Sequence, residues 1–214
     1  MANGYPAVSI VAGVPAVGNG PAIRRYHDSG RFDADRAAVV AAASAELQSI
    51  VATSCPAGPA ECQSQRLAIV VDVDDTLLDW YPSYARHRFD LPGAIRQAGV
   101  RSCLTRAISP TRALVNEAER LGVAVLIVTG RRSPVRAVTK SCLERRGVSG
   151  WDALVLRNAK QDRLPAATYK QQAHDSLAAS GWNVALSIGD QSADMVGTAD
   201  TARFLLPNPL YRTD

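Results

Sequence analysis

The chain has 214 residues, of which 47% are hydrophobic and 21% charged, and its formal net charge is +4. This length suits one domain with a modest insertion, and the composition is that of an ordinary globular protein. The Lys and Arg residues are scattered, which argues against a nucleic-acid polymer as partner, and we expect no apolar stretch long enough to span a membrane.

The N-terminal part predicts an arm followed by a packing helix. Residues 1–20 are rich in Gly, Pro and Ala, so we expect an extended segment without a core of its own. Within it, the apolar segment 7–17 is short and lacks a basic start, and we predict no signal peptide there. Residues 34–52 have the pattern of an Ala-rich amphipathic helix, with Asp33 or Ser29 as its cap.

Four cysteines, at positions 55, 62, 103 and 142, leave the redox state open. Cys55 and Cys62 bracket a loop rich in Pro and Gly that a disulfide could close, after which Cys103 and Cys142 would be left to pair. Four cysteines permit three connectivities, and free buried cysteines are the alternative to all of them. Disulfides would imply an oxidising compartment.

An apolar run at residues 67–73 ends in three acids, Asp72, Asp74 and Asp75. The β-favouring residues predict a buried strand of a parallel sheet, and ligands bind at the carboxyl ends of such strands. Like charges so close together cost free energy unless a cation neutralises them or one is protonated. The spacing therefore predicts a site for a hard divalent cation with oxygen ligands.

Residues 77–108 have no clear strand pattern and predict a small, mainly helical insertion. Trp80 and Tyr84 are candidates to line an apolar entrance for a leaving group, such as a nucleobase or an aryl ring. The alternative is that these aromatic residues form the core of the insertion itself.

After the insertion, strand and helix patterns alternate to the end of the chain. Strands are expected at residues 123–128, 153–156, 184–188 and 203–206. Before the first of these strands, a helix is expected to begin at the Ser-Pro pair 109–110 and to end at Gly122. A second helix is expected to begin at the Ser-Pro pair 133–134 and to end at Gly147, and a third is expected at 169–179. This alternation predicts an α/β fold with a doubly wound, Rossmann-like parallel sheet and right-handed crossovers.

Polar motifs follow three of these strands, and a lysine lies in the last helix. The motifs are DVDDT at 72–76, TGR at 129–131 and GDQSAD at 189–194, with Lys170 between the last two. In this order they resemble the four motifs of the haloacid dehalogenase-like (HAD) superfamily. The last motif and the Tyr-Lys pair are similar to those of the plant-type and bacterial class B (class III B) acid phosphatases. The resemblance spans residues 28–206.

Residue chemistry and the resemblance imply the same catalytic roles. Asp72 is the candidate nucleophile, forming an aspartyl-phosphate. Asp74 is placed to protonate the leaving oxygen, which needs a raised pKa that the crowd of carboxylates would supply. Thr129 and Gly130 are expected to bind phosphoryl oxygens, while Lys170 supplies a cation.

The resemblance also implies a Mg2+ site. The expected ligands are Asp72, the main-chain carbonyl of Asp74, and Asp190, with Asp194 orienting metal-bound water or the lysine. For Arg131 we leave open whether it reaches the substrate or holds the loop.

The predicted function is that of a Mg2+-dependent phosphomonoesterase acting on small-molecule phosphate esters, such as nucleoside monophosphates or aryl phosphates. A phosphotransferase using the same site and a non-catalytic storage or binding protein are the alternatives. We expect residues 1–66 to belong to the same domain as a catalytic core at 67–214, with 77–108 as its cap. Cysteine usage and the resemblance favour an extracytoplasmic location; the sequence does not predict the oligomeric state.

Overall fold

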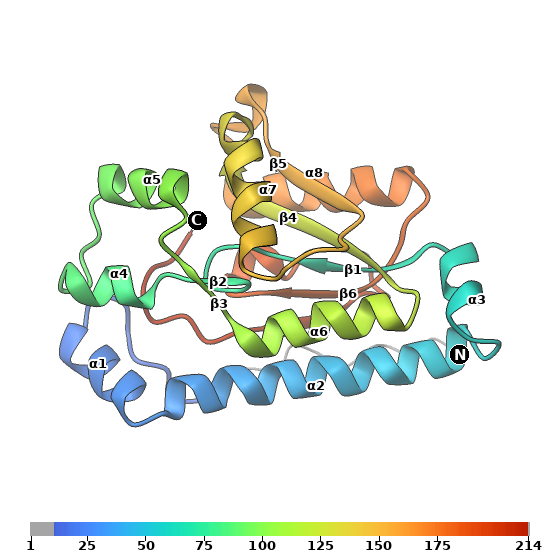
Figure 1. Cartoon of the computed structure of the whole chain (residues 1–214), viewed down its shortest axis with the longest axis horizontal. Helices are drawn as coiled ribbons and strands as arrows, with labels where there is room; N and C mark the ends of the chain where they lie inside the picture. Colours follow the sequence, from blue (N-terminus) through green and yellow to red (C-terminus); the bar gives the residue numbers. More distant parts are fainter. Residues whose placement is uncertain (1–10, 214) are drawn as a thin grey trace.

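The computed structural model describes residues 11–213, and its centre is a five-stranded sheet (Figure 1). All neighbouring strands pair in parallel, in the order β5-β4-β1-β6-β7. The strands are β1 (Leu67–Val71), β4 (Ala124–Arg132), β5 (Ala153–Arg157), β6 (Asn183–Gly189) and β7 (Ala202–Leu205). The chain winds from β1 to one side and then returns to the other, so the strand order reverses between β1 and β6. Ligands of such sheets bind at this switch point.

Helices cover both faces of the sheet, which confirms the predicted doubly wound α/β fold. One face is covered by α2 (Arg31–Ser54), α6 (Ser109–Arg120) and α7 (Arg136–Arg145), and the other by α8 (Ala166–Ala179). Along β1, Ile69 and Val71 join the first core, whereas Ala68 and Val70 join the second. Burial on both faces explains why β1 is apolar without interruption.

The helix boundaries near the N-terminus differ from the prediction. A helix that the sequence analysis did not expect, α1 (Gly20–Asp28), precedes α2, and Ser29 ends it. The residue before α2 is Gly30, whose φ of +76° suits a residue without a Cβ, and neither Ser29 nor Asp33 caps α2. Of the predicted arm, residues 1–10 lie outside the described residues, and Val14 packs against an aromatic cluster.

Among the described residues, α2 is the one helix that is long and apolar enough to cross a membrane, judged by length and composition only. The expectation that no stretch reaches this length is therefore wrong for α2, whose many alanines count as apolar. Its residues Val39, Ala43 and Leu47 are buried in the core of the sheet. Since a packed core helix passes the same test, this is weak support for a membrane span.

The segment between β1 and α6 is mainly helical and lies at one end of the sheet (Figure 1). It contains α4 (Tyr81–Arg86) and α5 (Gly93–Ser102), flanked by the short antiparallel pair β2 (Leu78–Asp79) and β3 (Arg106–Ala107). No strand was predicted here, because two residues are too few to form a pattern.

The four cysteines form two disulfides, which together make up one of the three connectivities that the sequence left open. Cys55–Cys62 joins the end of α2 to α3 (Pro59–Ser64). Cys103–Cys142 joins the residue that follows α5 to α7, and so ties the inserted segment to the sheet-covering layer.

Candidate active site

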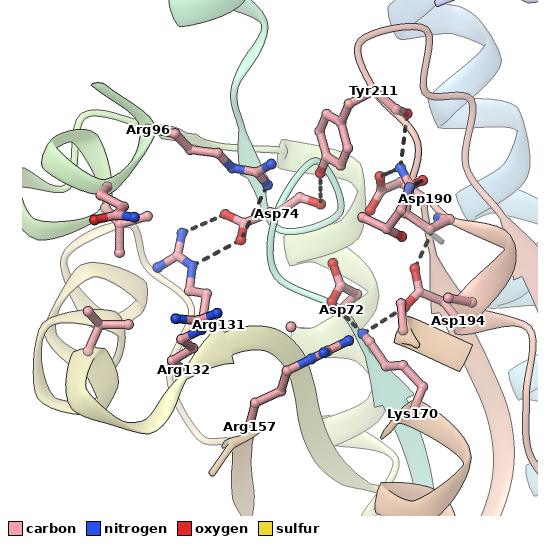
Figure 2. Close-up of a pocket in the computed structure, with 18 of the residues that line it drawn as sticks. Asp72, Asp74, Arg96, Arg131, Arg132, Arg157, Lys170, Asp190, Asp194 and Tyr211 are labelled. Atoms are coloured by element: carbon pink, nitrogen blue, oxygen red, sulfur yellow. Dashed lines mark hydrogen bonds and ion pairs between the residues drawn. The ribbon is translucent and has the colours of Figure 1, made fainter. Parts of the chain in front are cut away.

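The predicted motifs meet at one cavity, at the carboxyl ends of β1, β4 and β6 (Figure 2). The cavity has a volume of about 720 Å³. Asp72 lies at the end of β1, Gly130 in β4 and Asp190 after β6, and Lys170 reaches the cavity from α8. Residues separated by up to about 120 positions therefore converge because parallel strands end at the same edge.

Lys170 holds the carboxylate of Asp72. Its Nζ donates to Asp72 Oδ1 at 2.6 Å and to the Val128 carbonyl at 2.7 Å, and forms an ion pair with Asp194 Oδ1 at 2.6 Å. Burial alone would lower the pKa of Lys170, but the charges of Asp194 and Asp72 outweigh it and raise that pKa. Lys170 is therefore a charged, oriented group directly beside Asp72.

Three buried carboxylates, those of Asp72, Asp190 and Asp194, offer oxygen atoms within 4.8 Å of one another. Burial, together with the charges of Asp194 and Asp190, raises the pKa of Asp72 well above its usual range, against the effect of Lys170. Burial, Asp194 and Asp75 likewise raise the pKa of Asp190 to about 7. A divalent cation would remove this cost, and clustered carboxylate oxygens are the donors that Mg2+ prefers, so the residues fit such an ion.

Asp190 is held in place by groups from three segments. Thr76 Oγ1 donates to Asp190 Oδ1 at 3.1 Å, while Gln191 Nε2 and Asn208 Nδ2 donate to Oδ2, each at 2.5 Å. The preceding Gly189 has no side chain because a Cβ there would collide with Asp194. Asn208 was not among the predicted site residues; its signal in the sequence is a polar residue shortly after the last strand.

Asp74 has partners that the sequence analysis did not foresee. Arg131 binds it through two nitrogens, with Nη2 to Oδ1 at 2.6 Å and Nε to Oδ2 at 3.1 Å (Figure 2). Trp80 Nε1 also donates to Oδ1 at 2.6 Å, and Arg96 lies 3.9 Å from Oδ2. Burial would raise the pKa of Asp74, but Arg131, Arg96 and Trp80 together outweigh burial and lower it below its usual range. The raised pKa expected for Asp74 is therefore wrong for this arrangement, and its side chain lies outside the three-carboxylate cluster.

Arg131 and Thr129 lie near the end of β4, and Arg131 ties this segment to α7. The main-chain amide of Arg131 donates to Thr129 Oγ1 at 3.2 Å, and its Nη1 donates to Thr139 Oγ1 at 3.2 Å. Of the two roles left open for Arg131, holding the loop is seen directly, and the residue also lines the cavity. Thr129 is buried and does not line the cavity, whereas Gly130 does.

The expected aromatic entrance is not formed by Trp80 and Tyr84. Both side chains are buried, at 1% and 6% exposure, in a cluster with Phe32 and Phe89, and neither lines the cavity. The alternative interpretation, in which the aromatic residues are core, describes them. The aromatic ring in the cavity wall is that of Tyr211, whose hydroxyl donates to the main-chain carbonyl of Asp74 at 3.4 Å.

His174 lies one turn after Lys170 on α8 and is 4% exposed. Burial, and then the charge of Lys170, lower its pKa from 6.5 to about 4. Between these values the unfolded chain binds a proton that the folded chain does not, so the free energy of unfolding falls as the pH falls from 6.5 to 4. We expect His174 to account for roughly 3 kcal/mol of this loss at most.

Urea unfolding of wild type and His174→Gln across pH 4 to 7 measures this contribution. The variant is expected to have the shallower pH dependence in that range, whatever its stability at pH 7. Parallel curves for the two proteins would contradict the assignment.

Comparison with known protein families identifies related sequences. A family model described as HAD superfamily, subfamily IIIB (acid phosphatase) matches residues 14–214. Acid phosphatase 1 of Solanum lycopersicum is 32% identical over 146 residues, which cover 66% of this chain and 57% of that protein. Vegetative storage protein 1 of Arabidopsis thaliana is 33% identical over 146 residues, covering 66% and 54%. This chain thus spans little more than half the length of these plant relatives.

Solved structures with a similar fold include a class C acid phosphatase from Bacillus anthracis. It superimposes with a TM-score of 0.70 at 17% sequence identity, covering 87% of this chain and 82% of that one. The same enzyme with tungstate bound gives a TM-score of 0.68, also at 17% identity, with the same two coverages of 87% and 82%. At this identity the likeness supports the fold alone.

Proposed function

Because this chain belongs to subfamily IIIB of the HAD superfamily, the acid phosphatases, we propose that it hydrolyses phosphate monoesters of small molecules. One observation carries the proposal. The carboxylate of Asp72, held by Lys170 at 2.6 Å, ends the central strand in a cavity that also contains Gly130 and two more buried carboxylates.

The proposed first step is attack by an Asp72 oxygen on phosphorus. The bond from phosphorus to the ester oxygen breaks, and an aspartyl-phosphate forms. A phosphate dianion repels a carboxylate, so cations and donors must surround it, and in this proposal Lys170 and the Gly130 amide are among the cavity groups that do so. Water then attacks phosphorus, which releases phosphate and restores Asp72.

Asp74 has two successive roles in this scheme. In the ionised state favoured by Arg131, its carboxylate is ready to accept a proton from the attacking water. To protonate the leaving oxygen it must first carry a proton itself, and this requires that Arg131 loosen its two hydrogen bonds. We therefore propose that Arg131 shifts when the substrate binds.

We propose that the three-carboxylate cluster and the main-chain carbonyl of Asp74 hold Mg2+. The ion would neutralise charge on the phosphoryl group and on the nucleophile. Asp194, which pairs with Lys170, links this cluster to the lysine.

Removal of divalent ions is expected to abolish phosphate release, and added Mg2+ is expected to restore it. Mg2+ should also raise the midpoint of thermal unfolding of the wild type, since an ion that binds only the folded state stabilises it, and should do so less for Asp190→Asn. Phosphate release and thermal unfolding after dialysis against EDTA measure both effects. Full turnover in EDTA would remove the metal from the scheme.

The same site would support transfer of the phosphoryl group to an alcohol in place of water. The alternative to an enzyme is a storage protein without catalytic activity, since the relatives include vegetative storage proteins. The presence of Asp72, Lys170 and Asp190 in one cavity favours catalysis over storage.

We further propose that residues 77–108 act as a cap, since α5 supplies one wall of the cavity. Residues 1–66 would then be part of the same domain, because α2 packs on the sheet. The two disulfides support an oxidising, extracytoplasmic compartment.

A further inference from the structure

The cavity contains more positive charge than its catalytic carboxylates neutralise. Five arginines line it besides Lys170, and four carboxylates do so, all of them in the catalytic centre. Lys170 pairs with Asp72 and Asp194. The arginines in the lining are Arg96, Arg101, Arg131, Arg132 and Arg157.

Two of these arginines, Arg96 and Arg131, belong to the catalytic centre through Asp74. A third, Arg132, forms an exposed ion pair with Asp162 at 3.3 Å. Arg157 and Arg101 remain. Neither has a carboxylate within ion-pair distance among the residues that the structure describes.

Arg157 is built into the cavity wall. It is the last residue of β5 and pairs in register with Arg132 of β4. Its guanidinium lies 4.7 Å from the centre of the Tyr169 ring, and Nη1 donates to the Leu164 carbonyl at 2.9 Å. Its Nε is buried without a hydrogen-bond partner in the described part of the chain. In Figure 2 the side chain extends from the end of β5 toward Asp72 and Lys170. Packing thus fixes a guanidinium that has spare donors and no anion.

Arg101 lines the cavity from the inserted segment, not from the sheet. It lies near the end of α5, two residues before Cys103, which is bonded to Cys142 of α7. The disulfide therefore keeps this end of α5 beside α7. Val100 and Gln97 of the same helix line the cavity together with Arg101, whose side chain is exposed to solvent.

We propose, on the basis of the proposed function, that the preferred substrate carries a second anionic group on its leaving group. This group, a carboxylate or a second phosphate, binds between Arg157 of the core and Arg101 of the cap. A neutral aryl or sugar leaving group would leave both guanidinium groups without an anionic partner. The proposal replaces the aromatic entrance predicted from the sequence, since Trp80 and Tyr84 are buried.

The test compares substrates that differ only in the second anion. Glycerol 3-phosphate and 3-phosphoglycerate share a carbon chain, and glucose 6-phosphate and glucose 1,6-bisphosphate share a ring. We expect kcat/KM to be about 10-fold higher for the doubly anionic member of at least one pair, as for a charge-assisted hydrogen bond in a partly buried site. The pair that responds distinguishes a carboxylate from a phosphate.

Three variants locate the effect. Arg157→Met and Arg101→Met should each reduce the ratio of kcat/KM within the responding pair by about 5-fold or more. Arg120→Met removes one exposed positive charge from α6, outside the cavity, and should leave the ratio unchanged. Equal ratios in wild type and in both cavity variants would overturn the proposal.

Measuring substrate binding without turnover tests the second subsite independently of the proposed phosphatase activity. Dissociation constants of the same pairs, measured calorimetrically with Asp72→Asn, do not depend on turnover. Preference for the doubly anionic member would support the second subsite even if no ester were hydrolysed, in which case the proposed function alone would fail. Hydrolysis of all four esters with equal kcat/KM and equal binding would refute the subsite and leave the phosphatase assignment intact.

Discussion

Replacement of Asp72 by Asn is expected to reduce phosphate release from p-nitrophenyl phosphate at least roughly 1,000-fold, as for loss of a catalytic nucleophile. The amide has the shape of the carboxylate but no anionic oxygen to attack phosphorus. Stability should not fall, because the change removes one negative charge from a crowded buried cluster. Phosphate release and urea unfolding of the purified variant measure the two effects.

Asp33→Asn is the matched control for this variant. Asp33 is an exposed acid in the first turn of α2, far along the chain from the cavity residues, and its amide variant should keep full activity. If Asp72→Asn retained wild-type turnover while folded, Asp72 would not be the nucleophile.

Replacement of Lys170 by Met should cost both activity and stability. The two carboxylates that Lys170 pairs with would stay buried without a counter-charge, and breaking such a buried pair costs about 3 to 5 kcal/mol of unfolding free energy. We expect the loss at pH 7 to shrink toward pH 5 as Asp72, with its raised pKa, takes up a proton in the variant. Urea unfolding at both pH values, together with phosphate release, tests this.

Lys140→Met provides the comparison. Lys140 lies on the exposed side of α7 in an i, i+4 pair with Glu144 at 3.8 Å, a kind of pair worth less than about 0.5 kcal/mol. An unfolding free energy for Lys170→Met equal to that for Lys140→Met would mean that the buried lysine contributes nothing to the fold.

The convergence of the motifs was predictable from the sequence because it follows from topology. Asp72, Gly130 and Asp190 each come at or just after the end of an apolar run, and parallel strands bring such positions to one edge. The helix that carries Lys170 could also be predicted, from its local sequence pattern. For these residues, the local pattern and the fold give the same answer.

The partners of Asp74 could not be predicted, because they depend on side-chain directions across long sequence separations. Arg131 is 57 residues from Asp74 in the sequence. The same holds for Asp190, whose partner Asn208 is 18 residues from it. The sequence marks Asp74 as one acid among several, and burial next to other acids would raise its pKa. The positions of Arg131, Arg96 and the Trp80 indole reverse that direction, with Arg131 as the largest lowering cause.

The role of Trp80 illustrates another limit. An aromatic residue in a cap can face the substrate or the interior, and the sequence pattern is the same in both cases. The structure turns Trp80 inward, where its indole nitrogen donates to Asp74 while its ring packs in the core. The boundary between α1 and α2 was not predicted either. Gly30 separates the two helices through its backbone conformation, which composition does not reveal.

During turnover, phosphorus is expected to become covalently attached to Asp72. Wild-type protein mixed with substrate and Mg2+, quenched rapidly in acid, digested and analysed by mass spectrometry should yield a phosphorylated peptide that contains Asp72, and Asp72→Asn should yield none. A phosphoryl group on any other residue, or none at all in a sample that is releasing phosphate, would contradict the account.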